Sequence, residues 1–147
     1  MIVTEGQVRL QDWLCTRLGR SCSPNMRCIG NSQNGKLIAV VGIDDWDAAS
    51  AQIHVAGFGN WVTRAYLWAV FNYAFAQVGI NVLYGLIPEV NVKSRRFAKH
   101  VGFKEVYTIP EAHPQGGLVL VTLRKQDCKY VNREVYYGQE SQNTCCA

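Results

Sequence analysis

The sequence predicts a single α/β domain with a mixed sheet, mostly antiparallel and with one parallel pair of strands. A length of 147 residues fits one domain, and 48% apolar residues supply enough material for a core. A strongly apolar helix lies between two strand candidates, which is the order of a β-α-β unit and implies the parallel pair. An Asn-Gly turn upstream predicts an antiparallel hairpin.

The first part of the chain predicts a helix followed by a strand meander. Apolar positions recur at helical spacing between residues 3 and 18, with Thr4 as a candidate N-cap and Gly19 as a stop. Asn34-Gly35 suits a tight hairpin turn. In the third strand, Ile53 alternates with His54, so the two side chains face opposite sides of the sheet. The three strand candidates cover residues 26–30, 36–43 and 50–56.

The next helix should begin near Trp61 and is apolar on all sides over residues 65–76, apart from Asn72. A helix without a polar face is buried in a core or a membrane. This run is shorter than the roughly 20 residues that a bilayer requires, so we expect burial in the protein and no membrane partner. Gly79 is a suitable C-cap.

The second half of the chain predicts an amphipathic helix over residues 92–101, capped by Asn91 and ended by Gly102. Three further strand candidates cover residues 82–87, 104–109 and 118–123. We therefore expect one domain over residues 1–130 and a polar C-terminal tail over residues 131–147.

The composition limits the classes of function that the protein can have. A formal charge of +4 lacks the concentrated positive charge of a dedicated nucleic-acid binder. A solvated helix face explains the basic cluster better than nucleic-acid binding does, and this cluster comprises Lys93, Arg95, Arg96 and Lys99. The six cysteines form no C-x-x-C pair and no zinc pattern, so no metal site is expected. The N-terminus has no pattern of a secretory signal, so we expect reduced thiols and a cytoplasmic protein.

The segment from Asn91 to Phe103 reads Asn-Val-Lys-Ser-Arg-Arg-Phe-Ala-Lys-His-Val-Gly-Phe, and it resembles a segment typical of the GNAT N-acyltransferase superfamily. A loop over residues 59–64, Gly-Asn-Trp-Val-Thr-Arg, precedes a helix and a strand of matching lengths. The resemblance covers roughly residues 36–130. It is strongest to small GNAT proteins encoded by bacteriophages and prophages, which are similar to ribosomal-protein N-acetyltransferases.

The resemblance implies a V-shaped opening between the strand ending near Ala56 and the strand over residues 82–87. Acetyl-CoA would lie there as cosubstrate, with its pyrophosphate on amides at the N-terminus of the buried helix, where free N–H groups suit an anion. The residues assigned to cofactor binding are Val55, Ala56, Gly57, Gly59, Asn60, Trp61, Val62, Thr63, Arg64, Asn91 and Phe97.

The sequence departs from the family pattern in two places. The pyrophosphate loop retains only Gly57 and Gly59 as glycines, although Arg64 supplies a positive charge. Many members carry a tyrosine that protonates the departing thiolate, and Ala98 occupies that position. That role would fall to Ser94 or water, or would not be filled at all.

The candidate catalytic residues are His54, Ser94 and Asn91. His54 lies on the strand that bounds the opening, and the ordinary pKa of a histidine, about 6.5, suits a general base. A histidine that only stabilises the strand is the alternative, and Asn91 also suits a helix cap. The acidic bend around Asp44, Asp45 and Asp47 would attract a cationic acceptor, or it is a solvated turn.

The sequence thus predicts an acetyl-CoA-dependent N-acetyltransferase that acts by direct attack of a primary amine. The acceptor is a protein N-terminus, a lysine or a small amine. The alternative is a catalytically degenerate GNAT-fold phage protein that binds a host or virion protein. The oligomeric state is left open, with a dimer as one option.

Overall fold

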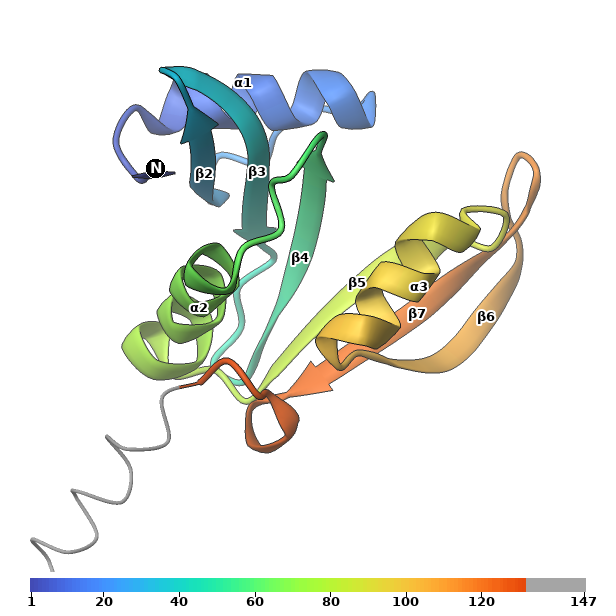
Figure 1. Cartoon of the computed structure of the whole chain (residues 1–147). Coiled ribbons are helices and arrows are strands. Elements are labelled where there is room, and N and C mark those ends of the chain that lie inside the picture. Colours follow the sequence, from blue (N-terminus) through green and yellow to red (C-terminus); the bar gives the residue numbers. More distant parts are fainter. Residues whose placement is uncertain (132–147) are drawn as a thin grey trace, which may run out of the picture.

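The computed structural model describes residues 1–131 and shows a seven-stranded mixed sheet in the order β1-β2-β3-β4-β5-β7-β6 (Figure 1). The strands are β1 (Ile2–Val3), β2 (Arg27–Gln33), β3 (Lys36–Asp44), β4 (Ser50–Gly57), β5 (Val82–Pro88), β6 (Lys104–His113) and β7 (Gly116–Arg124). The helices are α1 (Gln7–Leu18), α2 (Arg64–Asn72), its π-helical continuation η1 (Tyr73–Val78), α3 (Val92–Val101) and the short 3₁₀-helix η2 (Lys125–Asp127).

The predicted sheet topology is confirmed. The pairs β1–β2, β2–β3, β3–β4, β5–β7 and β6–β7 are antiparallel, whereas β4 and β5 are parallel. A parallel pair needs a crossover connection, and α2 with η1 forms it.

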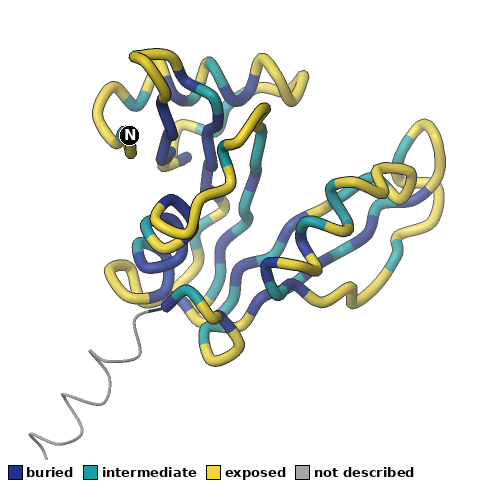
Figure 2. Tube along the Cα trace, in the orientation of Figure 1, coloured by how far each residue is buried: buried dark blue, intermediate teal, exposed yellow. Residues whose placement is uncertain are grey.

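The sheet separates two apolar cores because successive strand residues face opposite sides. On one face, α1 packs Leu10 and Leu14 against β2 and β3, including Cys28 and Val40. On the other face, α2 and α3 pack over the strands and bury the larger cluster (Figure 2). Burial raises the pKa of the Cys28 thiol to about 12, and the negative charge of Asp44 adds to the shift.

Tyr66 fixes the start of α2 to the sheet. Its hydroxyl accepts a hydrogen bond from the Val41 amide at 3.1 Å and donates one to the Ile29 carbonyl. Ile29 and Val41 are register partners on β2 and β3, so the phenol bridges the two strands. Burial raises the pKa of Tyr66, which keeps the hydroxyl protonated and able to donate.

The predicted turns and caps are largely confirmed. Asn34 and Gly35 have φ of 53° and 76°, as a primed hairpin turn requires. Asn91 caps α3 by accepting a hydrogen bond from the Ser94 amide. Gly79 ends the crossover helix with φ of 86°, and Gly102 ends α3.

Three predictions about the elements were wrong. The first helix begins at Gln7 after Gly6 instead of at Thr4, because Val3 pairs with Gly30 as part of β1. The apolar helix is not buried on all sides, since Trp68 is 48% exposed. The last two strands are longer than predicted: β6 continues to His113 and β7 begins at Gly116, so only a tight turn separates them.

The cysteines also differ from expectation. Cys15 and Cys22 are joined by a disulfide with their Cα atoms 5.8 Å apart, so the prediction of reduced thiols is wrong for this pair. No helix in the described part of the chain is long and apolar enough to span a bilayer. The predicted polar tail lies outside the described residues, apart from Val131.

Candidate active site

The most distinctive feature of the sheet is that its parallel pair opens into a V. β4 and β5 are in register only at Ser50–Val82, Ala51–Leu83 and Gln52–Tyr84. Beyond Gln52, β4 stays paired with β3 as far as Gly57, while β5 stays paired with β7 as far as Pro88 (Figure 1). The edge of β4 from residue 53 to residue 57 therefore has no strand partner on its β5 side within residues 1–131.

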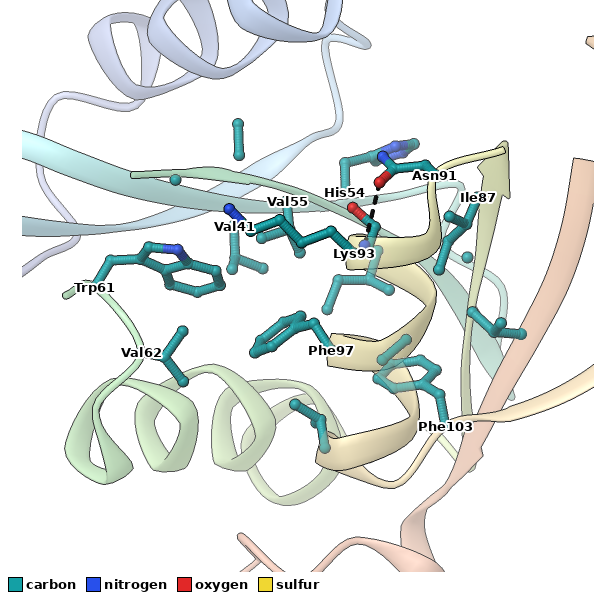
Figure 3. A pocket seen from close by; sticks show the side chains of 18 of the residues that line it. Val41, His54, Val55, Trp61, Val62, Ile87, Asn91, Lys93, Phe97 and Phe103 are labelled. Atoms are coloured by element: carbon teal, nitrogen blue, oxygen red, sulfur yellow. Dashed lines mark hydrogen bonds between the residues drawn. The ribbon is translucent and has the colours of Figure 1, made fainter. Parts of the chain in front are cut away.

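The opening contains a cavity of about 790 Å³ between β4, β5, α2 and α3. Its walls are mostly apolar and include Val70 on α2. Val55 on β4 and Phe97 on α3 also contribute (Figure 3). Cavities of this size with a few polar groups are typical small-molecule sites. The polar groups here include His54, Ser94 and Lys93.

Trp61 crosses the mouth of the cleft. Its indole lies against Gly57 so closely that an added Cβ there would be 2.8 Å from the ring. Its ring centroid lies 5.2 Å from that of Phe97 on α3 (Figure 3). Asn31 holds its backbone by donating a hydrogen bond to the Trp61 carbonyl at 2.9 Å. The indole therefore joins the two arms of the V at their open end.

The N-terminus of α2 follows directly after this tryptophan. The first amides of any helix have no partner within the helix. Thr63 caps α2, and its hydroxyl accepts a hydrogen bond from the Tyr66 amide at 3.2 Å. This leaves the amides of Arg64 and Ala65 without a partner within the helix, at its positive end. Arg64 itself is exposed.

His54 lies between two charged side chains. Its Nε2 is 2.7 Å from Asp44 Oδ1, and Arg20 Nη1 is 3.1 Å from its Nδ1. A guanidinium can only donate, so Nδ1 accepts from Arg20 and Nε2–H donates to Asp44. Asp44 is 1% exposed and His54 is 8% exposed. The Cys15–Cys22 disulfide brackets Arg20 in the chain.

On α3, Asn91, Ser94 and Ala98 take different positions. The Asn91 Oδ1 accepts from the Ser94 amide at 3.1 Å, so this oxygen is engaged as the helix cap (Figure 3). Ser94 lines the cavity. Ala98 is buried among apolar residues of the larger core and also lines the cavity, without a hydroxyl.

The three aspartates of the acidic bend differ in burial. Asp44 is buried against His54, whereas Asp45 and Asp47 are exposed. Burial raises the pKa of Tyr84 on β5, and the negative charges of these three carboxylates raise it further. Only Asp45 and Asp47 are accessible to a cationic acceptor. No cluster of metal-ligating side chains occurs in residues 1–131.

The structure brings most predicted site residues to the cavity but not all of them. The lining includes His54, Val55, Ala56, Gly57, Gly59, Trp61, Val62, Asn91, Ser94 and Phe97. Asn60, Thr63 and Arg64 are not part of it, although Thr63 caps the adjacent helix. Sequence reasoning missed Arg20 and the role of Asp44, because both contacts join residues far apart in the chain and no local motif marks them.

No protein-family model and no curated protein matches the sequence. Solved structures do match its fold. A spermidine N-acetyltransferase from Vibrio cholerae, solved as a dodecamer, has a TM-score of 0.70 at 14% identity and covers 90% of this chain and 96% of its own. The ribosomal-protein-S18-alanine N-acetyltransferase from Escherichia coli has a TM-score of 0.66 at 14% identity, and the match covers 84% of this chain and 92% of that protein.

A third match is a putative acetyltransferase from Salmonella typhimurium, solved with its cofactor acetyl-CoA, with a TM-score of 0.67 at 14% identity and the same coverage of 84% and 92%. At such identities the likeness shows the fold alone. The chain therefore has the GNAT fold that the sequence predicts.

The contact between Gly57 and Trp61 can be tested by a double-mutant cycle. Gly57→Ala places a methyl group against the indole, so it should lower the free energy of unfolding by about 1–3 kcal/mol. In a Trp61→Ala background the same substitution should cost much less, because the clash is gone. Urea denaturation measures both costs. Equal costs in the two backgrounds would show that the indole does not lie on Gly57.

Proposed function

We propose that the protein is an acetyl-CoA-dependent N-acetyltransferase that transfers an acetyl group to a primary amine by direct attack. The observation that carries the proposal is the open edge of β4 facing an apolar cavity of about 790 Å³. Three solved acetyltransferases share the fold, one of them with acetyl-CoA bound. The acceptor is a protein N-terminus, a lysine or a small amine.

The residues present fit acetyl-CoA, which would supply an activated acyl thioester. The unpaired edge of β4 offers backbone groups to an extended amide-bearing arm, as an added strand would use them. The free amides of α2 and the charge of Arg64 suit a pyrophosphate at the open end of the V. Asn60, Thr63 and Arg64 would act there from outside the cavity.

His54 is the proposed general base, and the Asp44–His54 pair supports this role. When Nδ1 takes a proton from the amine, the imidazolium is stabilised by the buried Asp44 carboxylate at Nε2. The amine would replace the exposed Arg20 guanidinium on Nδ1, because both present N–H donors to the same lone pair. Ser94 or water would return a proton to the leaving thiolate, since Ala98 cannot.

A second candidate is a catalytically degenerate GNAT-fold phage protein that binds a host or virion protein. Ala98 and the indole across the mouth favour it, as does the engagement of both nitrogens of His54. Cofactor binding separates the two candidates. A phage origin and a cytoplasmic location stay predictions, and the Cys15–Cys22 disulfide is more typical of oxidising compartments.

Acetyl-CoA should stabilise the folded protein. At about 100 times its dissociation constant, a ligand that binds only the native state adds about 2.7 kcal/mol to the free energy of unfolding. The melting temperature should rise by several degrees. Arg64→Glu should weaken acetyl-CoA and free CoA alike, whereas Arg9→Glu, the same charge change on α1, should not. An unmoved melting curve with both ligands would favour the binding protein.

The base can be tested with two substitutions on the same hydrogen-bonded group. His54→Ala should lower acetyl transfer by about 10²-fold or more, whereas Arg20→Ala, which frees Nδ1, should retain activity. CoA release with a panel of polyamines and peptides measures the rate, and circular dichroism confirms folding. Unchanged turnover in His54→Ala would remove this residue from the mechanism. Equal losses of acetyl transfer in both variants would indicate that His54 acts only by holding Arg20, so that Arg20 would be the functional residue.

A further inference from the structure

The apex of the cleft has an apolar floor. Ile53 and Gly85 are the first residues beyond the last β4–β5 register pair, and both line the cavity. Val121 on β7 lies next to Gly85, and Ala98 and Val101 on α3 also line the cavity and belong to the same buried apolar cluster as Val121. In the described part of the chain no buried side-chain polar atom lacks a hydrogen-bond partner, so the floor presents no polar group in need of a ligand.

Two floor residues are small although the local backbone does not require it. Gly85 has no positive φ, and an added Cβ would meet Val121 and Ile53 at ordinary contact distances of 3.5 and 3.6 Å. Ala98 lies on a regular helix with its side chain at the cavity wall. Larger side chains at these positions would shorten the cavity at the apex.

The direction of the cleft determines what reaches this floor. The amides at the start of α2 lie beyond Gly57, at the open end of β4, whereas Ile53 lies at the closed end. Residues 53 to 57 of an extended strand span about 13 Å. A CoA thioester with its pyrophosphate at the α2 amides would point its acyl group toward the apex.

We propose that the cleft accepts acyl groups longer than acetyl, of the butyryl to hexanoyl class, with the chain on the floor formed by Ile53, Gly85 and Ala98. The inference rests on the proposed function. The chemistry is unchanged: the acyl C–S bond breaks, an N–C bond to the amine forms, and the amine proton passes to His54 and then, through Ser94 or water, to the leaving thiolate.

Apolar burial sets the expected gain in affinity. Each methylene moved from water onto an apolar surface improves binding by about fourfold, so butyryl-CoA should bind about 15-fold more tightly than acetyl-CoA. Free CoA lacks the chain and defines the baseline. A larger side chain that fills the floor should abolish this gain in affinity and leave the affinity for free CoA unchanged.

Isothermal titration calorimetry on the full chain tests the inference with free CoA, acetyl-CoA, butyryl-CoA and hexanoyl-CoA. Ala98→Tyr should abolish the preference for butyryl-CoA and leave the affinity for free CoA within about twofold of wild type, as expected for a substitution remote from the pyrophosphate. His100→Tyr is the matched control, because it adds the same ring to α3 at an exposed position. If Ala98→Tyr does not fold, Ala98→Val reduces the cavity with less added volume.

The outcomes separate the inference from the function beneath it. If no CoA compound binds, the proposed function itself fails. If CoA and acetyl-CoA bind but butyryl-CoA and hexanoyl-CoA are no tighter than acetyl-CoA, only the longer-chain inference falls. If the gain with chain length persists in Ala98→Tyr or Ala98→Val, the chain lies elsewhere and the assigned floor is wrong.

Discussion

The separation of β4 from β5 is the constraint on which the candidate site depends. Each strand is held by its own antiparallel neighbour, β4 by β3 as far as Gly57 and β5 by β7 along its whole length. The two share register only up to Gln52–Tyr84. Because the arms diverge, a strand edge, a helix N-terminus and an apolar cavity face one opening. Trp61 contacts Phe97 across that opening, so access to the cavity depends on the packing of a single indole.

Much of the fold is predictable from the sequence because its signals are local. The Asn34-Gly35 turn, the Asn91 cap and the Gly102 stop each depend on residues within a few positions of one another. The misplaced start of α1 has a long-range cause, since Val3 pairs with Gly30 on β2. Trp68 is exposed although its neighbours are apolar, because the packing around a helix, and not its composition, decides which side is covered.

The candidate site was predictable in outline only. The residues that the resemblance predicts to bind a cofactor lie on β4, the following loop and α3, and most of them line the cavity. The group around His54 was not predictable, since Arg20 and Asp44 reach it from α1's end and from β3. Asp44 appeared in the sequence as one of three acidic bend residues, and only burial distinguishes it from Asp45 and Asp47.

Hydrogen–deuterium exchange with and without saturating CoA tests the central claim, that the opened pair is a cofactor cleft. Ligand contacts with the free edge of β4 and with the α2 amides should slow exchange in peptides covering residues 53–57 and 59–65. The exposed edge strand β6 should exchange at the same rate in both samples. Unchanged exchange at both cleft segments, or protection confined to another part of the sheet, would contradict the account.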